Sequence, residues 1–228
     1  MIPQAVIAVT AALTLKSDTA PVVVKVNKPR GTIYWGGAGL NGDYIADQLK
    51  ALQEAGIKSV FSGTRSYTLP ADALRSAFSL RYRGGPDFED WSIHGMEDNH
   101  SSQFNMIGYS YGSLLAAHTA YFYAESGHVI HHLVLIASPI DGDFLNDLIK
   151  HKNIRKIVIK DLPQYGDPLF AGMTEARMMA SFVRLGYQML KTIRTNEGWG
   201  HFYYAADSSE GSHRRRELAA FLYRQGLR

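Results

Sequence analysis

A strand, a tight turn and a helix follow one another without a break near the middle of this chain, and they constrain its fold more than any other feature. The predicted strand Phe104–Ile107 runs into Gly108-Tyr109-Ser110-Tyr111-Gly112, and a predicted helix spans Ser110–Tyr123. Glycines suit a strained strand-to-helix turn, because side chains two residues either side of Ser110 would meet neighbouring backbone. The turn lifts Ser110 over the edge of a sheet, where the helix N-terminus favours negative charge. The pattern predicts Ser110 as a nucleophile and the Tyr111 backbone N–H as an oxyanion donor.

The same region is the longest part of the chain without a charged side chain, Asn99–Ala124. Its polar start and its internal glycines and serines argue against a membrane span. The uncharged N-terminus, Met1–Leu15, lacks the Lys or Arg that a secretory signal places before its apolar run. We therefore expect neither a signal peptide nor a transmembrane segment, and a protein that is cytoplasmic or exported by a route independent of signal peptides.

Strands and helices alternate along the chain at a spacing typical of a mostly parallel sheet with helices on both faces. The length of 228 residues suits a single α/β domain over 1–228. The absence of cysteine excludes a thiolate nucleophile and a cysteine-ligated metal, and a net charge of +3 is too small for a nucleic-acid-binding signature. We predict strands at 5–15, 21–26, 32–35, 57–61, 104–107, 133–137 and 154–159, and helices at 43–55, 71–82, 110–123, 143–150, 174–192 and 213–224.

The Gly-x-Ser-x-Gly turn in this context resembles the nucleophile elbow of the α/β-hydrolase family, and the resemblance covers nearly the whole chain. In that family the nucleophile, an acid and a histidine follow in this order along the chain. The resemblance therefore implies that His201, in the loop Gly198-Trp199-Gly200-His201, is the general base. His213 is better explained as a solvated residue of the terminal helix, and His131 and His132 are expected to flank the sheet.

The acid and the second oxyanion donor are less sharply defined. Gly166-Asp167-Pro168-Leu169 resembles the Asp-Pro-Val/Ile element that carries the acid in many lipases, so we expect Asp167, with Asp161 and Asp143 as alternatives. Trp35-Gly36-Gly37-Ala38-Gly39 resembles the His-Gly-x-Gly segment of the family. This register assigns the second donor to the Gly37 backbone N–H, with Ala38 as the alternative.

The resemblance implies a serine hydrolase of the lipase, phospholipase or esterase type, which cleaves a carboxylic ester without a metal or cofactor. It extends less specifically to small bacterial lipases, including phospholipases delivered by type VI secretion. An acyl thioesterase is the alternative, and a non-catalytic relative that only binds is a weaker one. The short segment after the strand 133–137 predicts little or no lid, so a cap would have to come from 64–103. Arg214, Arg215 and Arg216 suggest contact with an anionic lipid surface.

Overall fold

The computed structural model describes residues 29–37, 42–64, 81–82, 92–93 and 99–228. The predicted strands 5–15 and 21–26 lie outside the described residues, as does most of the predicted helix 71–82 and of the cap region 64–103. The last two residues of that predicted helix, Arg81 and Tyr82, are described, and they lie in a turn and a bend rather than a helix.

The described strands form one sheet in the order β3-β2-β1-β4-β5-β6. Five of them run parallel, and β3 pairs with β2 in the antiparallel direction. A mostly parallel α/β sheet is therefore confirmed. The strands are β1 (Gly31–Trp35), β2 (Val60–Thr64), β3 (Ser92–Ile93), β4 (Phe104–Tyr109), β5 (His132–Ile136) and β6 (Ile157–Lys160).

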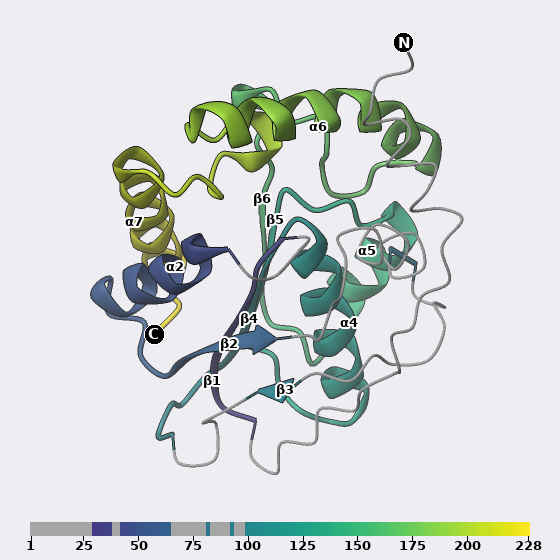
Figure 1. Cartoon of the computed structure of the whole chain (residues 1–228). Helices are drawn as coiled ribbons and strands as arrows, with labels where there is room; N and C mark the ends of the chain where they lie inside the picture. The colour runs from purple at the N-terminus through teal and green to yellow at the C-terminus, as the bar shows by residue number, and fades with distance from the viewer. Residues whose placement is uncertain (1–28, 38–41, 65–80, 83–91, 94–98) are drawn as a thin grey trace.

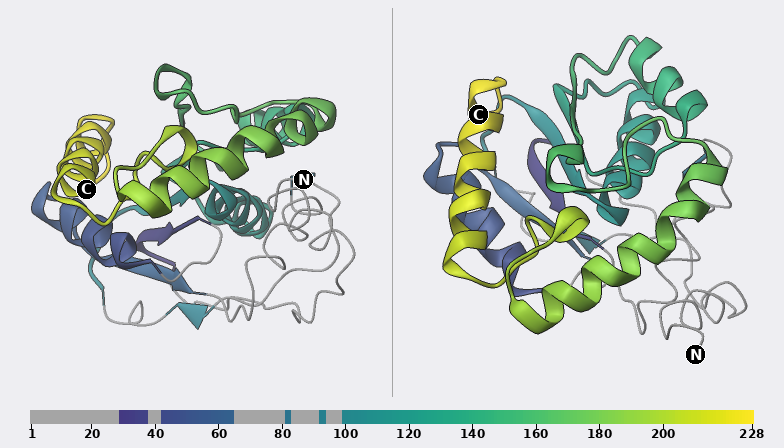
Figure 2. Two further views of the ribbon diagram at one scale, coloured as in Figure 1. Left: turned by 45° about the horizontal axis from the view of Figure 1, so that its top comes forward. Right: turned by 90° about the horizontal axis from the view of Figure 1, so that it is seen from above.

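Helices cover both faces of this sheet, as predicted. Helices α2 (Asp43–Glu54) and α7 (Ser209–Arg224) lie on one face, and α4 (Tyr111–Glu125) and α5 (Gly142–Lys150) lie on the other (Figure 1). Helix α6 (Glu175–Thr195) is different, because it lies across the end of the molecule at which the parallel strands finish (Figure 2). Two short 3-10 helices, η1 (Pro163–Tyr165) and η2 (Gly200–Phe202), precede and follow α6.

Two predicted strands begin later than expected. The predicted strand 57–61 starts at Val60, and the predicted strand 154–159 starts at Ile157. Ile154 forms an isolated parallel bridge with Ile130, and the continuous pairing of β6 with β5 begins three residues later, at Ile157. Within the described ranges, no helix is both long and apolar enough to cross a membrane.

Alternation along the central strands divides the core into two layers. In β5, Leu133 and Leu135 pack with α4 and α5, whereas Val134 and Ile136 pack with α2 and α7. Successive side chains of a strand point to opposite faces, and both faces here are covered, so these four residues are fully buried. The central strands therefore read as continuous apolar runs, and they hold the loops that follow them on a rigid base.

Candidate active site

Ser110 lies at the junction between the central strand β4 and helix α4. Its backbone has φ +56° and ψ −124°, a conformation that residues other than glycine rarely adopt. Its N–H donates to the carbonyl oxygen of Ile136 over 2.8 Å, so the neighbouring strand β5 holds the turn in place. An unfavourable backbone conformation of this kind persists only where the surrounding contacts hold it in place. Here it brings the serine hydroxyl to the end of the sheet at the start of a helix.

The two glycines of the turn are required by backbone packing. A Cβ atom at Gly108 would come far inside 3.0 Å of the Gly112 carbonyl oxygen, and one at Gly112 would come equally close to the Gly36 carbonyl oxygen. Both obstacles are backbone atoms, which cannot move aside as the end of a side chain can. The steric reason that the sequence suggested for these glycines therefore holds in the structure.

His201 faces the serine from η2. Its Nε2 lies 2.6 Å from Ser110 Oγ, and its Nδ1 lies 2.9 Å from Asp167 Oδ2 and 3.1 Å from Asp167 Oδ1. The imidazole is 5% exposed and the carboxylate is fully buried. Nδ1 must carry a proton to donate to the carboxylate, which leaves Nε2 as the acceptor that faces the serine hydroxyl.

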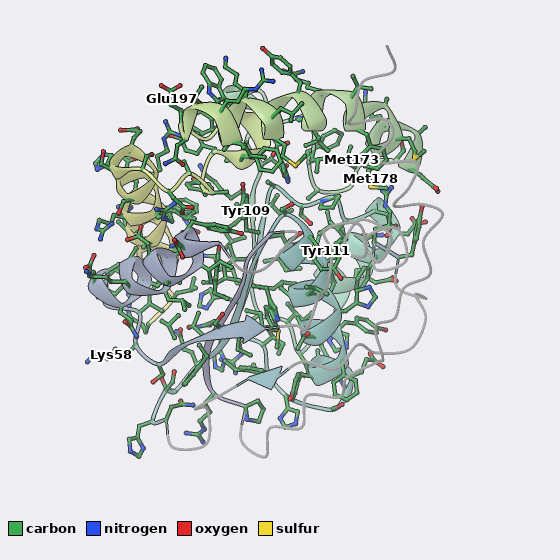
Figure 3. All side chains as sticks on the ribbon, in the orientation of Figure 1. Lys58, Tyr109, Tyr111, Met173, Met178 and Glu197 are labelled. Carbon is green, nitrogen blue, oxygen red and sulfur yellow. The ribbon has the colours of Figure 1, made fainter. Side chains whose placement is uncertain are left out.

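The loop that carries His201 is fixed by buried neighbours. The Tyr109 ring stacks on the imidazole with ring centres 5.9 Å apart, and its hydroxyl donates to the His201 carbonyl oxygen. Burial raises the pKa of Tyr109 well above its ordinary value, so the phenol remains a proton donor. Tyr109 and Tyr111, on either side of the serine, are labelled in Figure 3 below the α6 end of the molecule.

The structure distinguishes among the three aspartates that the sequence analysis considered as the acid partner of His201. Asp167 bonds to His201, and its Oδ1 also accepts the Leu169 N–H over 2.9 Å. Asp161 instead accepts the Ala171 N–H, and burial raises the pKa of its carboxyl. Asp143 lies in the first turn of α5. Of these three, all of them described, only Asp167 is hydrogen-bonded to the histidine.

Gln188 joins the two loops of the site, and nothing in the sequence pointed to it. Its side-chain oxygen accepts the His201 N–H over 3.0 Å, and its side-chain nitrogen donates to the Gly166 carbonyl oxygen over 2.8 Å. The residue is 7% exposed on the inner face of α6. Through this one amide, α6 is tied both to the histidine loop and to the loop that carries Asp167.

The predicted oxyanion donors come from two segments next to Ser110, the first residue of α4 and the residues that follow β1. Tyr111 is the first residue of α4, directly after Ser110. The Gly37 N–H donates to the hydroxyl oxygen of Tyr44 over 2.7 Å, and Ala38 lies outside the described residues. A Cβ built at Gly37 would be 3.5 Å from both Ser110 Cβ and the Tyr44 hydroxyl oxygen, so these three residues are close neighbours.

Tyr44 is a further residue that sequence reasoning missed. It lies in the first turn of α2, is 8% exposed, and packs edge-to-face against Tyr109. Burial raises its pKa to about 12, so the phenol keeps its proton. In the described part of the chain that proton has no hydrogen-bond acceptor, although the oxygen accepts from Gly37.

The three other histidines that the sequence analysis considered lie away from this arrangement. His213 is exposed on α7, where it pairs with Glu217. His131 and His132 lie at the start of β5, the opposite end of the strand from Ser110. Among the described residues, no group of three or more histidine, aspartate or glutamate side chains is placed to hold a metal ion.

Comparisons with known proteins identify no relative. No protein-family model, no curated protein and no solved structure matches the chain.

Proposed function

We propose that this protein is a serine hydrolase of the α/β-hydrolase type, which cleaves a carboxylic ester in a lipid-like substrate. One observation carries the proposal. A serine on a strained strand-to-helix turn lies within hydrogen-bond reach of a histidine, and a buried carboxylate orients that histidine. The chain order of Ser110, Asp167 and His201 is the order of that family.

In the proposed reaction, the Ser110 hydroxyl loses its proton to His201 Nε2 while Oγ attacks the ester carbonyl carbon. Asp167 holds the Nδ1 proton of the imidazole and stabilises the imidazolium that forms. The C–O bond to the leaving alcohol then breaks, and His201 returns the proton to that alcohol. Water repeats the sequence on the acyl-enzyme, which releases the carboxylic acid and restores Ser110.

The negatively charged oxygen of the tetrahedral intermediates needs hydrogen-bond donors that point at it. We assign one to the Tyr111 backbone N–H, as the sequence predicted. The Gly37 N–H already donates to Tyr44, so we assign the second role to the Tyr44 hydroxyl, which Gly37 orients. A donor of this kind is typically worth about 3 kcal/mol of transition-state stabilisation.

The test uses the wild-type protein beside Ser110→Ala. A fluorophosphonate probe should label wild type at Ser110 and leave the variant unlabelled. Wild type should release fatty acid from a mixture of phospholipid and triglyceride, and the variant should not. Ester turnover that survives Ser110→Ala would refute the proposal, and failure of Ser110 to label would favour a non-catalytic relative.

The thioesterase alternative uses the same groups, so a panel of acyl thioesters belongs in the same experiment. Hydrolysis of oxygen esters supports the proposal. Activity on thioesters alone would keep the triad assignment and replace the substrate class.

A further inference from the structure

The outer face of helix α6 carries an apolar stripe that the proposed chemistry does not use. Val183, Tyr187 and Ile193 are 64%, 65% and 71% exposed, and Met179 and Leu190 are exposed beside them. The spacing of four, four, three and three residues places all five on one side of a helix with 3.6 residues per turn. We call Met179, Val183, Tyr187, Leu190 and Ile193 the α6 stripe.

The α6 stripe faces away from the protein. The residues that α6 buries are Met178, Ser181 and Gln188. Ser181 donates to the Pro168 carbonyl oxygen, and Gln188 reaches the two loops of the site. The inner face is thus accounted for by contacts with the catalytic loops, while large apolar side chains on the other side are open to solvent.

Positive charge accompanies the stripe. Helix α6 contains four cations, Arg177, Arg184, Lys191 and Arg194, against one carboxylate, Glu175, so it carries a formal charge of +3. The whole chain also carries +3, which means that the remainder is balanced. No carboxylate of the described residues forms an ion pair with any of these four cations. Arg177 lies over the Phe170 ring and Lys191 over the Trp199 ring.

The arginines that the sequence suggested for lipid contact are engaged elsewhere. Arg215 is 2% exposed and donates to Asp47 over 2.7 Å, and Arg216 pairs with Asp47 and Glu54. Arg214 stacks on the Tyr203 ring and pairs with Glu210. These three side chains hold α7 to α2 and to the histidine loop, which leaves α6 as the better candidate for a lipid contact.

We propose that the outer face of α6 docks on an anionic lipid bilayer, with the α6 stripe inserted at the level of the headgroups and the two cations that border it, Lys191 and Arg194, against lipid phosphates. A basic helix with an apolar face is the kind of segment that lies in a membrane interface. This inference rests on the proposed function, because docking would hold the end of the sheet at which Ser110 lies close to a membrane that contains ester substrates (Figure 2). Gln188 then connects the docked helix directly to the His201 and Asp167 loops.

The test separates docking from turnover by measuring vesicle binding on a Ser110→Ala background. Sedimentation with phosphatidylcholine vesicles that contain phosphatidylglycerol should show binding that weakens with salt and with the removal of phosphatidylglycerol. Val183→Glu with Ile193→Glu should weaken that binding at least about tenfold, and Arg194→Gln should weaken it about fivefold. Ile149→Glu on α5, at a site 58% exposed, is the matched control and should bind as the parent does.

The docking proposal would be overturned if the protein did not bind the anionic vesicles. It would also be overturned if the Val183→Glu, Ile193→Glu variant bound them as tightly as the parent. A concentration-dependent dimer that this variant abolishes, in a protein that does not bind vesicles, would assign the α6 stripe to a second copy of the chain instead. Failure of the proposed function is seen separately. In the otherwise wild-type chain, the α6 variant should hydrolyse a water-soluble short-chain ester at the parent rate, whereas a protein without hydrolase activity would fail that assay and could still bind vesicles.

Discussion

Replacing Asp167 by asparagine tests the proposed triad at a single atom. The Leu169 N–H donates to Oδ1 of Asp167, so in Asp167→Asn this contact requires the amide oxygen at the Oδ1 position. The amide NH2 group then occupies the Oδ2 position, 2.9 Å from His201 Nδ1. A donor at that position can bond to Nδ1 only if Nδ1 is unprotonated, which favours the tautomer with its proton on Nε2. The amide oxygen at the Oδ1 position, 3.1 Å from Nδ1, is the weaker alternative partner that this shift must outcompete.

An Nε2–H group faces the Ser110 hydroxyl with a proton where the proposed reaction needs a lone pair. The variant keeps its shape and volume, yet the histidine can no longer act as a base in its resting tautomer. We expect kcat for a soluble ester to fall about 10⁴-fold, which corresponds to about 5 kcal/mol of transition-state stabilisation. Fluorophosphonate labelling of Ser110 should slow by a comparable factor, while the thermal unfolding midpoint should change little.

The matched control is Asp161→Asn, which alters the other carboxylate that follows β6. Among the described residues Asp161 accepts the Ala171 N–H alone, so an asparagine can keep that bond and activity should stay close to wild type. Retention of more than about a tenth of wild-type kcat by Asp167→Asn, or an equal loss in the two variants, would refute the tautomer argument.

Three further substitutions probe the rest of the site and the fold. Tyr44→Phe removes the hydroxyl assigned to the oxyanion and should lower kcat about 10²-fold with little change in KM; unchanged turnover would return that role to the Gly37 N–H. Gly112→Ala should lower the thermal midpoint and abolish activity, because its Cβ would meet backbone carbonyl oxygens, and normal stability in a melting experiment would contradict that packing. Burial lowers the pKa of His132 to about 4 in the folded protein, so the unfolded chain binds this proton more tightly. The free energy of unfolding should therefore be highest above pH 6.5 and should fall by about 3 kcal/mol as the pH is lowered towards 4. His132→Gln should flatten this decline in denaturant titrations at several pH values, and an equally steep profile would point to other groups.

Much of the fold could be predicted from local patterns, because a strand buried on both faces and a helix with one buried face leave clear periodicities. β4 and α4 were found within two residues from their apolar runs and the glycines between them. The start of β6 was missed because an apolar residue such as Ile154 can be buried beside the sheet without pairing along it. Apolarity predicts burial, whereas strand bounds depend on hydrogen bonds to a neighbour.

The order of residues along the chain was not sufficient to predict every contact in the candidate site. It placed a serine, three acids and a histidine in sequence, but it could not say which acid meets the histidine. That choice depends on how the segment after β6 turns, and the structure brings Asp167 to His201 while Asp161 bonds elsewhere.

The sequence by itself determined the α/β class, the strained turn at Ser110 and the need for its glycines, because each of these depends on neighbours within a few residues. Only the tertiary structure decided the partner of His201, the contact between Tyr44 and Gly37, and the link from Gln188 to both loops. These contacts join segments far apart in the chain, and a glutamine or tyrosine on a helix has no local pattern that marks it for such a role. The same holds for the net charge of +3, which becomes informative only when α6 is seen to carry it on an exposed helix across the end of the sheet.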